Sequence, residues 1–354
     1  MTLIDPTIPV REGEALDEAR LLAHLTRLHP ELQGPMEVSQ FPGGASNLTY
    51  LLRFPDRELV LRRPPFGHKA KSAHDMKREA TVIRALQGVF PWVPKLYDFC
   101  EDPGVLGADF YVMERIRGII LRGNEPEDLG FTPPDRTALC HALIDRLVAL
   151  HQVPWQETEL KTLCREGDYV ERQINGWCDR YVKARTEDAP AYSRVMDWLK
   201  ANRPPQVARV LVHNDYRFDN VVLNPDNPMD IIGVLDWEMA TIGDPLMDLG
   251  NALAYWVEAD DPAPFQMMRR QPTHLPGMLT REQVWQTYLE RAGLPDTLFA
   301  FYQVYGLFRL VVIIQQIYYR YFHGQTRDKR FAGFIHMVKF LEGYLEDLID
   351  KSGQ

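Results

Sequence analysis

The chain has 354 residues, of which 45% are hydrophobic and 25% charged, and its formal net charge is −9. This length predicts about two domains on a prior of ~150 residues each, with enough apolar residues for real cores. The negative charge argues against nonspecific nucleic-acid binding, and four widely spaced cysteines without a C-x-x-C pair indicate neither a zinc site nor a disulfide framework. No N-terminal apolar run of signal length and no uncharged run of about 18 apolar residues is present, so we expect a cytoplasmic protein without a membrane span.

The N-terminal part of the chain predicts one helix followed by a hairpin. Apolar residues recur at helical spacing from Glu14 to Leu28, and segment 38–54 predicts strand, glycine turn and strand. The turn contains Gly43, Gly44, Ser46 and Asn47. Glycines allow a backbone to approach a phosphate closely, although an ordinary hairpin turn is the simpler explanation from this segment alone.

A strand at 58–63 and a helix at 73–86 follow. The strand ends in Arg62 and Arg63 before a proline pair, and we expect Arg63 to be a solvated surface charge. Glu79 is the acid in the middle turns of the helix. Without further information the simpler interpretation is an exposed carboxylate that pairs with Lys77 or Arg84. Such a surface ion pair contributes well under ~1 kcal/mol to stability.

Segments 93–100 and 109–118 predict two strands that complete a small antiparallel sheet. From Pro133 the pattern becomes helical, with leucines at helix spacing up to His151. We expect His151 to cap carbonyls at that helix end and assign it no chemistry. Two more helices follow at 169–183 and 192–201.

The chemistry concentrates between Val210 and Gly250, where polar residues follow short β-branched runs. Asp215 precedes Asn220 by five residues, and Asp236 follows the strand 231–235. Phosphoryl transfer needs such a set, because one carboxylate positions or deprotonates the attacking hydroxyl while an Asn oxygen and a second carboxylate hold Mg²⁺. Taken singly, each of these residues would be an ordinary turn residue.

These motifs resemble the aminoglycoside phosphotransferase family, which consists of small-molecule kinases with a protein-kinase-like fold. The family signature H-x-D-x-x-x-x-N reads here as His213, Asp215 and Asn220, and Asp236 in V-L-D-W-E stands where protein kinases carry the Asp of D-F-G. The resemblance implies His213 and Asp215 as catalytic residues, with Asp215 as the base. Asn220 and Asp236 are then the Mg²⁺ ligands, and ATP is the phosphoryl donor.

The resemblance also assigns nucleotide contacts in the N-terminal part. It makes the turn with Gly43, Gly44, Ser46 and Asn47 the phosphate loop. Arg62 stands where protein kinases read the Lys of V-A-I-K, and Arg keeps the charge but changes the geometry. Glu79 would orient Arg62. The strand 109–118 would run into a hinge that binds adenine through its backbone, with Met113, Glu114 and Ile116 lining it.

Two acids follow Asp236. Asp244 precedes a proline in a helix-start pattern and is expected to be a structural N-cap. Asp248 belongs, by the resemblance, to a motif that supports the catalytic loop.

Three helical stretches are predicted within 281–348, and an aromatic one spans 299–322. Arg309 lies there in an apolar segment and therefore needs an anionic partner. Arg320 lies about 20° around the helix from it, with Tyr305 near that face. Two explanations stay open: an internal pair with Asp248 or Glu258, or contact with an anionic acceptor.

The predicted fold is α+β and two-lobed, protein-kinase-like, with an antiparallel sheet plus helices in residues 1–115 and a mainly helical lobe in 116–354. The predicted function is ATP-dependent phosphorylation of a hydroxyl group on a small molecule. The stretches L-R-R-P-P, G-G-A-S-N-L-T-Y and L-D-W-E-M-A-T-I-G-D-P are similar to the branch of the family found alone or fused to acyl-CoA dehydrogenases. That branch implies hydroxy acids or hydroxyacyl thioesters as acceptors.

Three alternatives remain. An amino sugar or amino alcohol could be the acceptor instead. A nucleotide-binding regulator without turnover is a rival from another class, favoured by Arg62 and the atypical glycine loop. A protein kinase is a weaker rival, because no A-P-E-type segment follows Asp236.

Overall fold

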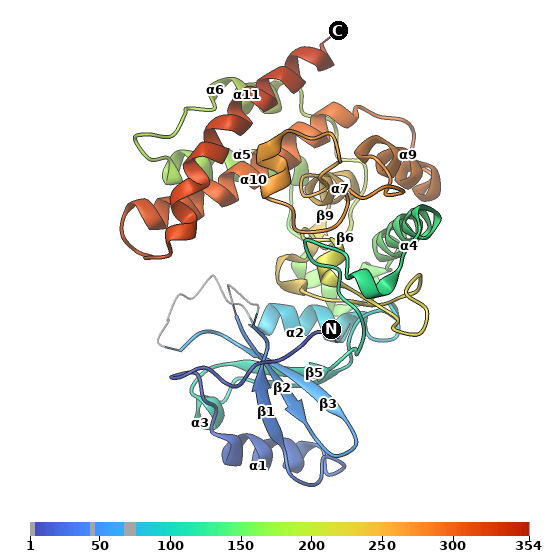
Figure 1. Cartoon of the computed structure of the whole chain (residues 1–354), viewed down its shortest axis with the longest axis vertical. Helices are drawn as coiled ribbons and strands as arrows, with labels where there is room; N and C mark the ends of the chain where they lie inside the picture. The colour runs from blue at the N-terminus through green and yellow to red at the C-terminus, as the bar shows by residue number, and fades with distance from the viewer. Residues whose placement is uncertain (1–3, 43–46, 67–75, 354) are drawn as a thin grey trace. The chain divides into compact units, whose positions relative to one another are not determined.

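The computed structural model describes residues 4–42, 47–66 and 76–353. The chain separates into two compact units (Figure 1). Unit 1 comprises Met1–Ile120, Pro154–Leu160 and Asn220–Ala240, and unit 2 comprises Leu121–Val153, Lys161–Asp219 and Thr241–Gln354. The boundary predicted after Arg115 falls just before Ile120. The sequence pattern carried no sign that two later segments return to unit 1.

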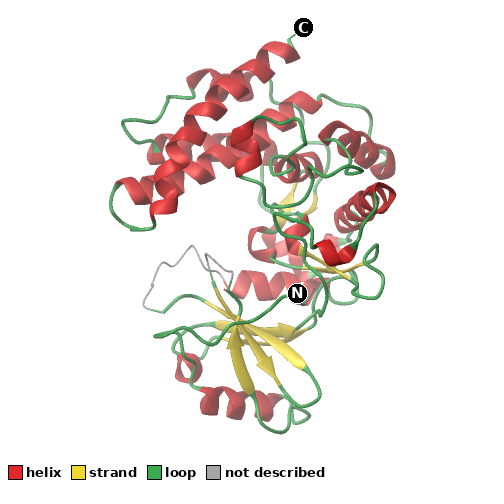
Figure 2. Ribbon diagram, viewed as in Figure 1, coloured by secondary structure: helices red, strands yellow, loops and turns green. Residues whose placement is uncertain are grey.

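Unit 1 is built on a sheet, drawn as yellow arrows in Figure 2. It has five strands in the order β1-β2-β3-β5-β4, and every neighbouring pair is antiparallel. Its strands are β1 (Glu37–Gln40), β2 (Leu48–Arg53), β3 (Glu58–Arg63), β4 (Leu96–Cys100) and β5 (Phe110–Glu114). Its helices are α1 (Glu18–Leu28), α2 (Met76–Leu86) and α3 (Pro103–Leu106), with the short η2 (Trp155–Glu157) and η5 (Trp237–Met239). The predicted antiparallel sheet with helices is confirmed.

The sheet has two faces with different partners. The helix α1 contributes Leu21 and Leu25 to a core that also holds alternate residues of the strands: Tyr50, Leu52, Leu59, Leu61, Phe110 and Val112. Successive side chains of a strand point to opposite faces, so Arg62 and Arg63 enter different surroundings.

Arg63 lies on the face that α1 covers and is only 3% exposed. Its Nη1 donates to the carbonyl of Leu106 at 3.1 Å, and its guanidinium lies 3.7 Å from the ring centroid of Phe66. The expectation of a solvated charge was therefore wrong. Strand alternation alone could not show that a helix and a turn close over this face.

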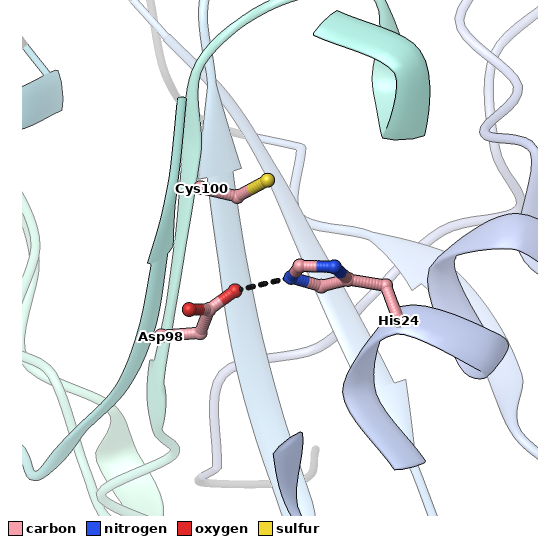
Figure 3. A group of neighbouring side chains, drawn as sticks. All are labelled: His24, Asp98 and Cys100. Atoms are coloured by element: carbon pink, nitrogen blue, oxygen red, sulfur yellow. Dashed lines mark hydrogen bonds and ion pairs between the residues drawn. The ribbon is translucent and has the colours of Figure 1, made fainter. Parts of the chain in front are cut away.

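The helix α1 is tied to the sheet by a polar contact as well (Figure 3). Nε2 of His24 donates to Oδ2 of Asp98 on β4 at 2.7 Å, with the thiol of Cys100 nearby. A tetrahedral zinc ion would hold its nitrogen and oxygen ligands roughly 3.3 Å apart. The group has the spacing of a direct hydrogen bond, so it reads as a tie between α1 and β4.

A separate hairpin completes unit 1. The strands β7 (Val221–Leu223) and β8 (Ile231–Val234) pair antiparallel, with Val221 opposite Val234. Ile119 bridges to Leu223, which joins the hairpin to the segment after β5. The predicted strands around the N-P-D-N-P turn are thus present.

Unit 2 is mainly helical, as predicted. Its helices are α4 (Pro133–His151), α5 (Tyr169–Ala184), α6 (Ser193–Ala201), α7 (Pro245–Leu253), α8 (Ala263–Met267), α9 (Arg281–Ala292), α10 (Phe299–Phe322) and α11 (Phe334–Ser352). The strands β6 (Val210–Val212) and β9 (Thr241–Gly243) pair antiparallel. Short turns of helix are η1 (Glu127–Leu129) and η6 (Lys329–Gly333), and the chain passes from one unit to the other within η3 (Glu159–Leu163) and η4 (Phe218–Asn220).

The centre of unit 2 is α10, which packs against α5, α7 and α11. Among the described helices it is the one long and apolar enough to cross a membrane, with a mean hydropathy of 1.3, but 72% of that window is buried inside the protein. This is the pattern of a core helix. Asp244 caps α7 by accepting from the amides of Leu246 and Met247 at 2.9 and 3.2 Å, so the predicted N-cap is confirmed.

Candidate active site

In unit 1 the two predicted metal ligands lie at one end of the β7–β8 hairpin. Asn220 directly precedes β7 and Asp236 follows β8, and the amide of Leu235 donates to the carbonyl of Asn220 at 2.8 Å. Asp236 adopts φ 66° and ψ 65°, a left-handed conformation that is uncommon outside glycine. The hairpin therefore brings two residues that are distant in sequence to the same end of the β7–β8 pair.

Arg62 lies at the centre of a charged cluster beside this hairpin end. Its Nη1 contacts Oε1 of Glu79 at 2.5 Å and Oδ1 of Asp236 at 3.3 Å, and its Nη2 lies 3.9 Å from Oε2 of Glu238. Burial opposes the charge of Arg62, but Glu79 and the other acidic groups raise its pKa well above the ordinary value. Burial raises the pKa of Glu79, and Arg62 opposes that shift.

The Arg62–Glu79 pair matches the pairing that the resemblance implies. Glu79 is 1% exposed, so the alternative of an exposed helix carboxylate is wrong. The helix α2 turns Glu79 toward the sheet because Ala80 and Ile83 of the same helix are buried as well.

Glu238 is a site residue that the sequence reasoning missed. Nδ2 of Asn47 donates to its Oε2 at 3.3 Å, so Asn47 reaches the charged cluster. The other predicted phosphate-loop residues, Gly43, Gly44 and Ser46, lie outside the described residues. The available signal was an acid two positions after Asp236, because Glu238 lies within the single turn η5 that begins directly after Asp236.

The cluster suits a divalent cation. One guanidinium faces the carboxylates of Glu79, Asp236 and Glu238, so carboxylates outnumber cations, and the side chains of Asp236 and Glu238 are 31% and 32% exposed. Hard cations such as Mg²⁺ take oxygen ligands of this kind. The residues present therefore fit the implied metal, which Asn220 and Asp236 would hold.

The predicted hinge begins where β5 ends at Glu114. Met113 is buried, Glu114 is exposed and Ile116 is half-buried. The amides of Glu114 and Arg115 donate to carbonyls of Lys95 and Glu58, so these two donors are used within unit 1. Ile116 lies against Gly233 of β8: a Cβ atom added to Gly233 would be 2.7 Å from Cδ1 of Ile116.

In unit 2 the predicted catalytic residues follow β6. His213 is fully buried, and its Nδ1 accepts from the amide of Asp215 at 3.2 Å. Both oxygens of Asp248 accept from this loop, Oδ2 from the amide of His213 at 2.7 Å and Oδ1 from that of Asn214 at 2.6 Å. Asp248 thus supports the loop as the resemblance implies, and the buried ring of His213 orients the backbone.

His151 has a different place from the one expected. Its Nε2 donates to Oδ2 of Asp248 at 3.1 Å, and its Nδ1 pairs with the hydroxyl of Tyr288 at 2.6 Å. It does not act as a simple cap of helix carbonyls, because the buried acid of α7 lies beside the end of α4. Burial would raise the pKa of Asp248, but His151 and the loop amides hold it below the ordinary value.

Asp215 has a charged neighbour that the sequence reasoning passed over. Nη1 of Arg217 donates to its Oδ1 at 2.6 Å, and Nε of Arg217 donates to Oδ1 of Asp219 at 2.8 Å. The guanidinium also lies 4.4 Å from the ring centroid of Tyr255. Arg217 therefore holds the two acids of the loop together.

Comparison with known proteins decides the family. The model of a family described as "Phosphotransferase enzyme family" matches residues 37–284. The chain belongs to this phosphotransferase family. Acyl-CoA dehydrogenase family member 10 of Mus musculus is 36% identical over 323 residues, and family member 11 of Homo sapiens is 32% identical over 330 residues. These matches cover 90% and 91% of this chain but only 30% and 41% of those proteins, so the chain spans less than half of their length.

A solved structure supports the same assignment. A Ralstonia eutropha protein, named provisionally as an aminoglycoside phosphotransferase, superposes with a TM-score of 0.81 at 30% identity and covers 95% of this chain and 99% of its own. The kinase-like fold is thus shown for this chain, and its family and this neighbour support a small-molecule kinase. The match to acyl-CoA dehydrogenase family members agrees with the branch that the sequence motifs indicated.

The phosphotransferase does not place its predicted acceptor residues together. Arg309 and Tyr305 are buried, whereas Arg320 is exposed in the last turn of α10, roughly 16 Å along the axis from Arg309. Among the described residues Arg309 does not pair with Asp248 or Glu258, so that explanation is wrong, whereas contact with an anionic acceptor stays a prediction. Its Nη2 donates to the carbonyl of Asn214 at 2.8 Å, and its guanidinium lies 5.2 Å from the ring centroid of Trp177.

Proposed function

We propose that this phosphotransferase transfers the γ-phosphoryl group of ATP to a hydroxyl group of a small molecule, with Mg²⁺ held by Asn220 and Asp236. The observation that carries the proposal is the hairpin end where these two residues lie, beside the ion pair of Arg62 and Glu79. Asp215 precedes Asn220 by five residues in the family signature. A regulator without turnover would not need this acid.

Each residue then has a defined task. The acceptor oxygen bonds to the γ-phosphorus, the bond from that phosphorus to the bridging oxygen breaks, and ADP leaves. Asp215 orients the hydroxyl and receives its proton. Arg62 binds phosphate oxygens, and Glu79 keeps its guanidinium oriented. The metal supplies neutralisation of charge on the phosphate oxygens.

The remaining predicted residues complete the nucleotide site. We propose that Asn47 and the glycine turn before it contact the phosphates, and that Met113, Glu114 and Ile116 line the adenine site. Asn47 supports this through its contact with Glu238 in the charged cluster. Adenine would bind to backbone groups of the hinge other than the amides of Glu114 and Arg115, which already donate within unit 1.

For the acceptor we propose a hydroxy acid or a hydroxyacyl thioester. Support comes from the relatives named as acyl-CoA dehydrogenase family members, which match nearly the whole of this chain. An amino sugar is the competing acceptor, favoured by the name of the Ralstonia eutropha protein. The two acceptor classes differ in charge, since hydroxy acids are anionic and amino sugars are cationic.

The test is a panel of acceptors in which ADP release and the phosphorylated product are both measured. The panel contains hydroxy acids of increasing chain length, their coenzyme A thioesters, aminoglycosides and amino alcohols, with reactions lacking an acceptor as the control. We expect turnover with anionic hydroxy compounds only. Turnover with aminoglycosides alone would refute the proposed class of acceptor. ATP binding without a phosphorylated product from any compound of the panel would favour a nucleotide-binding regulator without turnover.

A further inference from the structure

We propose that Arg309 is a positioning residue of the catalytic loop, which fixes the peptide group between Asn214 and Asp215 and thereby the carboxylate of Asp215. The proposal rests on the proposed phosphoryl transfer, because it assigns Arg309 to the alignment of the base. It replaces the hypothesis that Arg309 contacts an anionic acceptor.

The first observation is that both ends of one peptide group are held. Nη2 of Arg309 donates to the carbonyl of Asn214 at 2.8 Å, and the amide of Asp215, which belongs to the same peptide plane, donates to Nδ1 of His213 at 3.2 Å. A peptide group is rigid and planar. Holding its oxygen and its nitrogen therefore fixes the direction in which the chain enters Asp215.

The second observation is the conformation of Asn214, which has φ 64°. This left-handed region is unfavourable for a residue with a Cβ, although Asn tolerates it better than most. The amide of Asn214 donates to Oδ1 of Asp248 at 2.6 Å. Its side-chain Oδ1 accepts from Nδ2 of Asn251 at 3.0 Å and from the hydroxyl of Tyr169 at 3.3 Å. The polar groups of Asn214 are thus held by side chains from α5, α7 and α10.

The third observation is that burying the charged side chain of Arg309 costs free energy. Its side chain is buried, at 4% exposure, and among the described residues it forms no ion pair with a carboxylate. The ring of Trp177 offers a π face at 5.2 Å, and Tyr305 one turn before it is buried too. A neutral donor would hold a carbonyl with less desolvation. A guanidinium holds it more firmly, because a charged donor makes the stronger hydrogen bond.

The consequence is that Arg309 acts from a distance on the geometry of transfer. Its contact is with backbone, so its removal leaves the nucleotide residues of unit 1 and the side chain of Asp215 chemically intact. A displacement of about 1 Å in a catalytic group can cost on the order of 100-fold in rate. We therefore expect an effect on kcat rather than on substrate affinity.

The experiment compares Arg309→Met, Arg309→Lys and Arg180→Met. Arg180 is the matched control, since its exposed guanidinium lies 4.5 Å from the ring centroid of the same Trp177. With the acceptor that the wild type uses, Arg309→Met should lower kcat about 10- to 100-fold with the KM of ATP and acceptor within about twofold. Arg309→Lys, which keeps a charged donor, should recover part of kcat, and Arg180→Met should behave as wild type.

Two kinetic outcomes would overturn the proposal. A raised acceptor KM with unchanged kcat would make Arg309 an acceptor contact. A lowered melting temperature with normal kcat per folded molecule would leave it a structural residue. If Arg309→Met does not fold, Arg309→Lys carries the comparison, with normal kcat counting against the proposal.

A second readout separates this proposal from the proposed function. Amide hydrogen exchange in peptides covering residues 210–220 should speed up in Arg309→Met and not in Arg180→Met, whether or not any acceptor is turned over. Unchanged exchange would refute the positioning role. A wild type that phosphorylates none of the acceptors, combined with faster exchange in Arg309→Met, would refute the function and retain the role of Arg309 in holding the loop.

Discussion

Both units place a non-glycine residue with positive φ among their predicted site residues, Asn214 between His213 and Asp215 and Asp236 at the predicted metal site, but they hold it differently. In unit 2, Asn214 has φ 64°, and its amide, carbonyl and side chain all bind buried partners. In unit 1, Asp236 has φ 66°, while its carboxylate contacts Arg62 at 3.3 Å and its side chain remains 31% exposed. The two residues therefore share a backbone conformation, but Asn214 is held by buried partners, whereas the side chain of Asp236 stays accessible to solvent.

The difference follows from what each loop has to do. A residue that aligns a base gains from a rigid backbone, because rate depends on small displacements. A residue that binds a metal must keep its oxygens available, because the ion requires them as ligands. Around Asn214 the charges of Asp248 and Arg309 hold backbone groups, whereas around Asp236 the charged side chains face one another with an excess of carboxylates.

The largest expected effect is that of a substitution in unit 2 on the rate of phosphoryl transfer. Asp215→Asn should lower kcat by roughly 10² to 10⁴, the span for a positioned acid or base, with ATP affinity near normal. Steady-state kinetics and nucleotide titration measure the two quantities. Asp219→Asn is the matched control, because Asp219 binds the same Arg217, and it should lower kcat less than about 10-fold. Equal losses in both variants would mean that the ion pair, and not the base, limits transfer.

The next effect is on nucleotide binding through unit 1. Asp236→Ala should abolish the Mg²⁺-dependent part of ATP affinity, because a doubly charged ion beside phosphates needs its carboxylate ligand. Calorimetric titration with and without Mg²⁺ measures it. Asp226→Ala, in the exposed turn between β7 and β8, should leave the metal dependence intact. Retained Mg²⁺ dependence in Asp236→Ala would place the ligand elsewhere.

The smallest effect separates two neighbouring arginines. Arg62→Lys keeps a charge beside Glu79 but loses the planar fork, so we expect the KM of ATP to rise about 3- to 10-fold with little change in stability. Arg63→Lys should leave that KM unchanged and cost about 1 kcal/mol through the lost contact with Phe66. Kinetics and thermal unfolding report both. A change of nucleotide KM in Arg63→Lys would contradict the separation of the two sheet faces.

The sequence by itself determined the element types, the family and the order of the motifs. Strand alternation and helix periodicity arise from local geometry, so the sheet strands, α10 from Phe299 and the N-cap at Asp244 were predictable. The separation of Asp215 and Asn220 along the chain is a property of the sequence, so it is visible without a structure. The cytoplasmic location stays a prediction.

The tertiary structure decided what surrounds each charge. Whether Arg63 is solvated depends on α1 and α3 covering its face, and whether His151 caps carbonyls depends on Asp248, almost 100 residues later, lying beside it. Arg309 was expected to need an acid, yet a backbone carbonyl and an aromatic ring receive it. Burial and partner choice are set by contacts between residues distant in sequence, and a local pattern carries no record of them.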